Sequence, residues 1–327
     1  MTSSRTGADG LHHVGHLVDD LGAAAGLYRR MGFSVPTPAF PALPPAPGEP
    51  PRPVGAGNTR VRFANAFLEV VGVSSGEHPG PGVDIAPLEV PDHALAGVSA
   101  AVARTARRLA ERLDAGEGLH VLVWETGDAD GEARRLDRLG IEHGGVQRLR
   151  RPGGAGDEGG AGRGGGEGGV PVGYLEVDPN APEARLAAAE PTPGVSAAVH
   201  PNGAVALVGA VMCVPPGALP ETEARFERYL DRTARARGTA RVFDLGEAEL
   251  SLVEGTAAEP PGSGQGGPRR PPPRRPALTS VTVSVADQDA VAARLADQGI
   301  PARAAADGGL SVGPRWAHGA ELRLRGV

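Results

Sequence analysis

The chain has 327 residues, a net charge of -6 and a pI of about 5.9, and it carries no basic stripe of the kind that binds nucleic acid. It contains no lysine, so all 33 basic residues are arginine, and chemistry that needs a lysine Schiff base or a phosphate-binding lysine is excluded. Its one cysteine, Cys213, excludes an intramolecular disulfide framework and paired-cysteine metal sites.

The length predicts two domains, at roughly 100–200 residues per domain. The N-terminus is polar, and no run reaches the roughly 20 apolar residues that a membrane span needs. We therefore expect a cytoplasmic protein with neither membrane nor nucleic acid as a partner.

The first predicted unit has a strand at residues 11–18, a helix at 21–31 and short strands at 33–35, 59–63 and 67–73. Asp19 and Asp20 are suited to cap this helix, and Gly32 to end it. The Pro-rich residues 36–53 indicate a long loop. A further helix at 94–113 has an apolar stripe flanked by arginines, and we interpret it as a connecting helix on the outside of the molecule.

Three further units follow the same order. The second has a strand at 119–125, a helix at 128–139 and strands at 146–150 and 172–177. The third has a strand at 206–214, a helix at 221–236 and strands at 240–245 and 249–253. The fourth has a strand at 278–285, a helix at 288–298 and strands at 302–304, 309–312 and 320–325.

This repetition predicts an α+β fold of four strand-helix-strand-strand-strand (βαβββ) modules. One such module leaves a sheet face uncovered, and pairing two modules closes a barrel-like cavity. We therefore predict two paired domains, at residues 1–190 and 195–327. The Gly-rich segment 151–169 would be an insertion in the first domain, and the Pro/Gly-rich segment 257–276 a linker in the second.

Several motifs resemble one known superfamily. Residues 11–21, LHHVGHLVDDL, and residues 27–33, LYRRMGF, resemble the first strand and helix of vicinal oxygen chelate proteins. Residues 67–71, FLEVV, and residues 55–59, GAGNT, resemble elements of its glyoxalase-like branch, although Asn and Thr stand in a different order. Residues 200–203, HPNG, also resemble a segment of that branch.

The resemblance implies a divalent metal ion (Zn, Ni, Mn or Fe) inside the barrel, held by first and last strands. A substrate would chelate the metal through two adjacent oxygens. His13 and Glu69 occupy the ligand positions of the first unit. In the second unit His120 and Glu176 stand at the same spacing. His120 is then the candidate third ligand, and Glu176 a fourth ligand or the catalytic base.

A different alignment of the first two units leaves it undecided whether His120 points into the cavity. Matching the helix starts at Asp20 and Asp128 places His13 opposite Val121, so His120 would point to the other face of its strand. His12 and His16 alternate with His13, and we interpret both as structural, with His200 as a turn residue. Units three and four lack a first-strand histidine, and Glu249 and Glu321 have no evident partner. These two units are therefore predicted to be structural or a metal-free binding site.

Two classes of function follow. The first is a metal-dependent lyase, isomerase or dioxygenase acting on a small molecule with vicinal oxygens. The second is a metal-free protein that sequesters a small molecule, as bleomycin-resistance relatives do. A degenerate scaffold without a ligand is a third possibility. Because tandem modules can close their cavities within one chain, a monomer and a homodimer are both compatible with the sequence.

Overall fold

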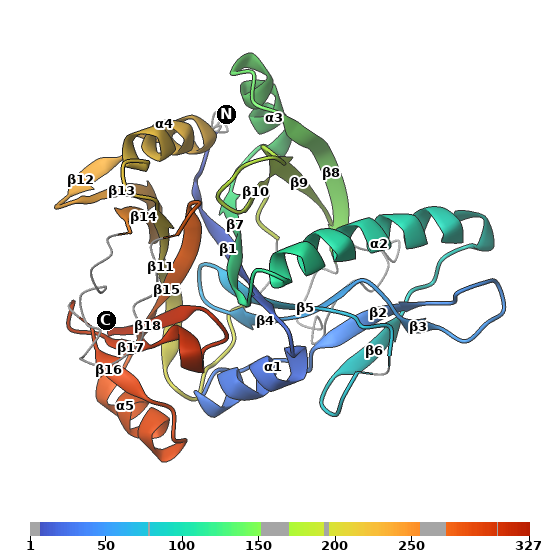
Figure 1. The fold of residues 1–327 in the computed structure, drawn as a ribbon, viewed down its shortest axis with the longest axis horizontal. Coiled ribbons are helices and arrows are strands. Elements are labelled where there is room, and N and C mark those ends of the chain that lie inside the picture. Colours follow the sequence, from blue (N-terminus) through green and yellow to red (C-terminus); the bar gives the residue numbers. More distant parts are fainter. Residues whose placement is uncertain (1–6, 78, 152–169, 193–195, 256–272, 306) are drawn as a thin grey trace.

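The computed structural model describes residues 7–77, 79–151, 170–192, 196–255, 273–305 and 307–327. Nearly all of the predicted Gly-rich insertion, 152–169, and most of the predicted linker, 256–272, lie outside the described residues. The described chain is mixed α+β, with five α-helices and two large sheets (Figure 1). None of its helices combines the length and the apolar character that crossing a membrane requires.

Sheet A has ten strands in the order β3-β2-β4-β5-β1-β7-β10-β9-β8, with β6 paired to β2. Its two halves meet where β1 and β7 pair antiparallel, and β5 and β10 run parallel to β1 and β7 on either side. The strands are β1 (Gly10–Val18), β2 (Ala39–Leu43), β3 (Arg52–Pro53), β4 (Ala56–Arg62), β5 (Phe67–Val73), β6 (Asp84–Pro87), β7 (Gly118–Glu125), β8 (His143–Arg151), β9 (Val170–Val177) and β10 (Arg185–Ala189).

Sheet B repeats this arrangement with eight strands in the order β12-β13-β14-β11-β15-β18-β17-β16. Its halves meet at the antiparallel pair β11 and β15, flanked by the parallel strands β14 and β18. The strands are β11 (Ala204–Val214), β12 (Arg235–Arg237), β13 (Ala240–Leu245), β14 (Ala248–Glu254), β15 (Ala277–Val285), β16 (Ala302–Ala304), β17 (Leu310–Val312) and β18 (Glu321–Gly326), with a short 3-10 helix, Pro314–Trp316, before β18.

The helices are α1 (Leu21–Arg30), α2 (Asp92–Leu113), α3 (Ala129–Arg138), α4 (Leu219–Leu230) and α5 (Gln288–Asp297). An aspartate caps the start of α1, α3 and α5, and each carboxylate accepts a hydrogen bond from the backbone N–H three residues on. For Asp20, Asp128 and Asp287 these bonds are 2.8, 2.8 and 2.9 Å long. Such a cap stabilises a helix by about 1 kcal/mol. The predicted cap at Asp20 is confirmed.

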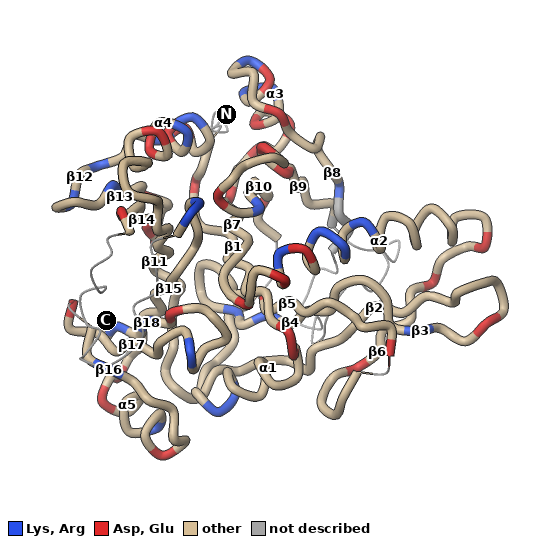
Figure 2. The backbone as a smooth tube through the Cα atoms, in the orientation of Figure 1, with Lys and Arg blue, Asp and Glu red and all other residues tan. Residues whose placement is uncertain are grey.

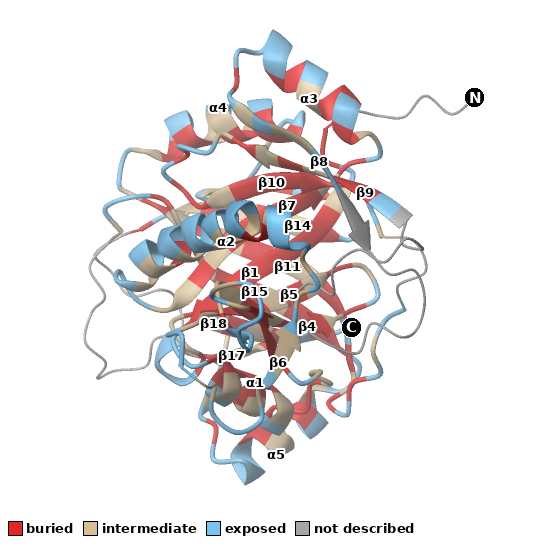
Figure 3. Ribbon diagram, turned by 90° about the vertical axis from the view of Figure 1, so that its right-hand side faces the viewer, coloured by how far each residue is buried: buried red, intermediate tan, exposed pale blue. Residues whose placement is uncertain are grey.

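One continuous core joins the two sheets. It takes alternate residues of the central strands, such as Val14 and Leu122 from sheet A and Met212 and Val283 from sheet B. Helices α1, α3, α4 and α5 contribute to the same core, and the buried strands fill the middle of the molecule (Figure 3). The other residues of each strand point to the opposite face, because side chains alternate along a strand.

Polar contacts also tie sheet A to the second half of the chain. In α3, Glu132 and Arg135 form a buried ion pair with 2.7 Å between Nη2 and Oε1. Arg135 also donates to the carbonyls of Arg228 and Tyr229 in α4, at 2.7 and 2.5 Å. Both side chains are almost fully buried, so this pair sits in the contact between the two halves of the molecule.

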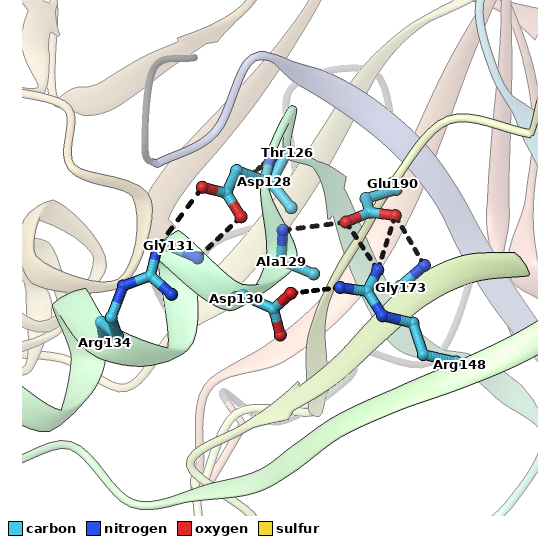
Figure 4. A network of polar contacts seen from close by, with 9 residues as sticks. All are labelled: Thr126, Asp128, Ala129, Asp130, Gly131, Arg134, Arg148, Gly173 and Glu190. Atoms are coloured by element: carbon cyan, nitrogen blue, oxygen red, sulfur yellow. Dashed lines mark hydrogen bonds and ion pairs between the residues drawn. The ribbon is translucent and has the colours of Figure 1, made fainter. Parts of the chain in front are cut away.

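A second polar network fixes the edge of sheet A (Figure 4). Glu190, just after β10, accepts hydrogen bonds from the backbone N–H groups of Ala129 and Gly173 at 3.1 and 2.8 Å. It also accepts two hydrogen bonds of 3.0 Å from Arg148 in β8. One carboxylate therefore joins the start of α3 to β8, β9 and β10. This network sets the position of the strands that carry Tyr174 and Arg185.

Several elements differ from the sequence prediction. Strand β2 lies inside the Pro-rich stretch predicted as a loop, and residues 33–35 form no strand. Helix α4 ends at Leu230 and not at 236, because Asp231 takes a left-handed backbone conformation with φ of 53°. Strand β12 follows. Strand β10, with the sequence RLAAA, was not predicted.

Candidate ligand-binding site

The face of sheet A that points away from the core carries His13, Phe67 and Glu69, and we call it the site face. Two β-bulges in the β1–β7 pair shape it. One lies at His12, between the pairs Leu11–Trp124 and His13–Val123, and the other at His120, between Gly15–Val121 and His16–Leu119. A bulge inserts one extra residue and interrupts the alternation of side chains.

The first bulge brings His12 beside His13. Their Nδ1 atoms are 2.7 Å apart, and the His12 ring lies 5.3 Å from that of Phe67. The prediction that His12 faces away from His13 is therefore wrong, because strict alternation does not hold across the bulge. His16 does turn into the core, where it bonds to Tyr28 and to the carbonyl of His318.

His13 and Glu69 come together on the site face. The His13 ring stacks on Phe67, with centroids 4.5 Å apart and planes 10° apart, and His13 Nε2 lies 3.9 Å from Glu69 Oε2. The other carboxylate oxygen of Glu69 accepts a hydrogen bond of 2.7 Å from Asn58 and lies 3.9 Å from Arg60 Nε. The half-buried carboxylate therefore has partners on both oxygens, which explains how it fits between apolar residues.

The second bulge decides the placement of His120. Val121 and Val123 pack with Ala187 on the site face, whereas Leu119 packs in the main core. Burial, together with the positive charges of Arg112 and Arg185, lowers the pKa of His120 to about 4. His120 therefore lies close to two arginines and is neutral at physiological pH.

The two halves of sheet A are not equivalent in donor residues. The helix caps Asp20 and Asp128 align His13 with Val121. Gly15 faces Glu69 across the β1–β5 pair, and by the same alignment Val123 faces Ala187 across the β7–β10 pair. The counterpart of Glu69 in the second half is thus an alanine, and the counterpart of His13 is a valine.

The sequence predicted Glu176 on the last strand of the second unit, but the structure places it one strand earlier. It lies on β9, paired with Ala187 of the true last strand, β10. Its carboxylate oxygen Oε1 is 3.2 Å from Arg185 Nε and 3.7 Å from an Nη atom of Arg108 in α2. Glu176 is therefore engaged by two guanidinium groups.

Helix α2 connects β6 to β7 and packs over the site face with most of its surface exposed, as predicted for a connecting helix on the outside of the molecule. Its Leu109 forms an apolar cluster with Leu17 and Val71, both on the site face. Most of the rest of α2 is exposed (Figure 3). The apolar stripe was visible in the sequence, but a stripe does not tell which sheet face it covers.

Positive charge exceeds negative charge on the site face. Among the residues that the structure describes, Arg60, Arg108, Arg112 and Arg185 gather there with the carboxylates of Glu69 and Glu176, and Glu111 acts on Arg112. Burial alone would lower the pKa of Arg185, but Tyr174, Glu176 and Glu69 raise it above its ordinary value. Basic residues are conspicuous on the half of α2 nearest the sheet centre (Figure 2). The site is therefore suited to an anion.

The donor set only partly fits a metal ion. His13 and Glu69 offer a nitrogen and an oxygen that point at one another. His120 and Glu176 are instead neighbours of arginines, whose charge opposes a cation. Among the residues that the structure describes, no group of three or more His, Cys, Asp or Glu side chains is arranged to hold a metal.

The fold and the site face together define a two-sheet α+β protein with a candidate small-molecule site. The sequence profile of the glyoxalase-like domain family matches residues 11–230. The chain therefore belongs to this family, within the vicinal oxygen chelate superfamily. No curated protein matches the sequence.

Solved structures with similar folds are distant in sequence. The Mn(II)-bound glyoxalase from Novosphingobium aromaticivorans superposes with a TM-score of 0.56 and 11% identity, over 98% of this chain and 83% of that chain. A hypothetical protein from Staphylococcus aureus gives 0.54 and 11%, over 97% and 99%. A 4-hydroxymandelate synthase mutant from Streptomyces coelicolor gives 0.50 and 14%, over 91% and 77%. These identities support the fold alone.

Sequence reasoning did not identify the arginines of the site or Phe67 as site residues. Arg60 and Asn58 lie in the GAGNTR segment, where their alternation with buried Thr59 was a usable signal. No sequence signal pointed to Arg185, because the alanine-rich segment of β10 has low strand propensity and was not predicted as a strand. His200 is more than a turn residue, since it accepts a hydrogen bond from the backbone N–H of Ser34 and donates to the carbonyl of Arg62.

Proposed function

We propose that the first domain binds a small organic anion with two adjacent oxygens, held on the site face under α2 without a metal ion. The observation that carries the proposal is the position of Arg185. Its guanidinium group contacts Glu176 and the ring of Tyr174, and the negative charge of Glu69 also interacts with it. The three carboxylates of Glu69, Glu111 and Glu176 do not neutralise the four arginines, so an anionic ligand would complete the charge balance.

Arginine is suited to this role because its planar guanidinium presents two parallel N–H donors to a carboxylate. Phe67 and Tyr174 offer ring surfaces beside Arg60 and Arg185, with the guanidinium carbons 5.4 and 5.9 Å from the ring centroids. These rings would contact the carbon skeleton of a ligand. We keep residues 1–190 and 195–327 as the two proposed domains of a cytoplasmic monomer or homodimer.

Isothermal titration calorimetry tests this proposal on protein passed over a chelating resin. Oxalate is the anionic probe with adjacent oxygens, and catechol is its neutral counterpart. We expect oxalate to bind, and Arg185→Met to weaken binding about tenfold or more, since a hydrogen bond to a charged group contributes about 1.5–3 kcal/mol. Arg104→Met, which removes an exposed arginine of α2, is the matched control. Equal affinity in wild type and Arg185→Met, or no binding of oxalate, would contradict the proposal.

A second candidate is the metal-dependent lyase, isomerase or dioxygenase. The His13–Glu69 pair favours it, because both side chains are oriented by neighbours, His12 and Asn58, and direct one atom each at the other. Under this proposal His120 would be the third ligand and Glu176 a proton acceptor or fourth ligand. A bound divalent ion would polarise a substrate oxygen.

Metal content of protein purified without chelators distinguishes the two candidates. About one divalent ion per chain, lost in His13→Ala and kept in His93→Ala, supports the metal-dependent enzyme. His93 is an exposed histidine of α2 and serves as the control. No retained metal after incubation with Zn²⁺, Mn²⁺, Ni²⁺ and Fe²⁺ removes this candidate and leaves the metal-free site.

A further inference from the structure

The second sheet also has a face turned away from the core, which we call the outer face of sheet B. Along three strands of sheet B, residues that point into the core alternate with residues of the outer face. The core residues are Leu250 and Leu252 in β14, Val281 and Val283 in β15, and Leu322 and Leu324 in β18. The outer face therefore carries Glu249, Ser251, Ser280, Thr282, Glu321 and Arg323. None of these residues falls within the part of the chain that the family profile matches.

Within the part of the chain that the structure describes, two buried hydrogen-bond donors on this face have no partner. Ser280 is 0% exposed, and its hydroxyl group makes no hydrogen bond to a described residue; the same holds for the buried Nε atom of Arg323. The β15–β18 register pairs Ser280 with Glu321 and Thr282 with Arg323, so the two donors lie on adjacent strands. A buried donor without an acceptor costs about 1–3 kcal/mol, so an acceptor is expected to reach these groups.

Neighbouring side chains cannot supply that acceptor as they are placed. Glu321 pairs with Ser280 in the strand register, but one of its oxygens accepts from the Ser311 hydroxyl at 2.7 Å and the other binds an Nη atom of Arg323 at 3.1 Å. Glu249 is engaged by Arg235 and Arg237 of the edge strand β12. As placed, neither carboxylate accepts a hydrogen bond from the Ser280 hydroxyl or from Arg323 Nε.

The charged and apolar side chains of the outer face of sheet B indicate the chemistry of the acceptor that would bind there. Among the described residues, its arginines outnumber its acidic side chains: Arg235, Arg237, Arg303, Arg323 and Arg325 against Asp244, Glu249 and Glu321. Val211 pairs with Ser280 across β11 and β15, Val253 lies on the next strand, β14, and both valines are only half-buried. An anionic group with an apolar body matches this pattern.

We propose that the outer face of sheet B is a second binding site, for a small carboxylate with an apolar body. The Ser280 hydroxyl and Arg323 Nε would both donate to the carboxylate, and Val211 and Val253 would contact the apolar part. The side chain of Arg323 is 28% exposed and that of Glu321 is 23% exposed, so a ligand would reach Ser280 and Arg323 Nε by displacing the Glu321 carboxylate from Arg323. This site is independent of the one proposed on sheet A.

The test uses the full chain carrying Arg185→Met, which weakens the sheet A site. Benzoate is the probe, benzyl alcohol is its neutral analogue, and inorganic phosphate is the anion without an apolar body. Binding is followed by thermal unfolding and by the side-chain ¹⁵N–¹H resonance of Arg323 Nε. The variants are Ser280→Ala and Arg323→Lys, with Ser251→Ala as a half-buried serine control on the same face.

We expect benzoate to raise the melting temperature and shift the Arg323 Nε resonance, while benzyl alcohol does neither. Ser280→Ala and Arg323→Lys should each weaken benzoate binding about tenfold or more, and Ser251→Ala should leave it unchanged. Phosphate binding as tightly as benzoate would overturn the apolar part of the proposal. An equal benzoate response in Ser280→Ala, or none in the parent protein, would overturn the site itself.

Ser280→Ala also gives a result that needs no ligand. If the hydroxyl is truly unpartnered, its removal leaves the melting temperature of the free protein unchanged or slightly raises it. A clear loss of stability in Ser280→Ala, with none in Ser251→Ala, would show that the hydroxyl already has a partner, and the proposal would fail.

Discussion

Lowering the pH should destabilise the protein through His16. This side chain is 0% exposed, and its ring nitrogens contact Tyr28 Oη at 2.8 Å and the carbonyl of His318 at 2.7 Å. A carbonyl can only accept, so Nε2–H donates to His318 and Nδ1 accepts from the Tyr28 hydroxyl. The ring is thus fully bonded in its neutral form. Burial is the main cause that lowers the pKa of His16 to about 4. The hydrogen bond to the His318 carbonyl opposes this shift, the charge of the His318 ring adds to it, and the charge of Glu117 opposes it.

The size of the effect follows from the linkage between protonation and folding. The folded pKa of about 4 lies below the unfolded value of 6.5, so the unfolded chain binds more protons between these limits. Stability is therefore fully present above pH 6.5 and is lost as the pH falls toward 4. At 1.36 kcal/mol per pKa unit, His16 should cost about 2 kcal/mol at pH 5 and about 3 kcal/mol below pH 4.

Urea unfolding between pH 7.5 and 4.5 measures this contribution. His16→Gln keeps a donor for the His318 carbonyl but cannot titrate, so its unfolding free energy should fall by about 2 kcal/mol less than that of wild type between pH 7.5 and 5. His93→Gln, at an exposed histidine, should reproduce the wild-type slope. Equal slopes for wild type and His16→Gln would refute the reasoning.

Three further perturbations test the packing around the site. Glu132→Gln leaves Arg135 buried beside a neutral partner and should cost about 3–5 kcal/mol in urea unfolding, whereas a loss below 1 kcal/mol would mean that the pair is solvated. Gly15→Ala places a Cβ 2.6 Å from Val121 Cβ and should cost about 1–3 kcal/mol, and in a double-mutant cycle Val121→Gly should remove most of that cost. Asp287→Ala removes the cap of α5 and should cost about 1 kcal/mol by thermal unfolding; an unchanged melting temperature would rule out the cap.

Local patterns predicted much of the fold. Alternating apolar residues identified β1, and the capping Asp20 with the closing Gly32 identified α1, because these signals depend only on near neighbours. Strands β2 and β10 were missed for the opposite reason. Pro41 and the alanines of β10 have low strand propensity, and only pairing with β4, β6, β7 and β9 makes these segments extended.

The candidate site was predictable in part. The motif resemblance selected His13 and Glu69, and the structure brings them within 3.9 Å. The bulges at His12 and His120 could not be read from the sequence, because a bulge is set by pairing between two distant strands. The cationic character of the site also escaped prediction. It arises where Arg185 of β10 and Arg108 of α2 meet Glu176, and no sequence spacing relates these residues.

Equivalent positions in the four strands that flank the sheet centres show why the fold does not define the chemistry. Glu69 faces Gly15 in β1, and Glu249 faces Gly209 in β11. The corresponding residues of β10 and β18 are Ala187 and Arg323, which face Val123 and Thr282. One backbone position thus carries a carboxylate, a methyl group or a guanidinium. Glu69 alone has a histidine beside it among the described contacts, while Glu249 is held by arginines. The shared fold thus brings these four positions to equivalent places, whereas the side chains there differ in chemistry, so the fold alone does not determine what each position could bind.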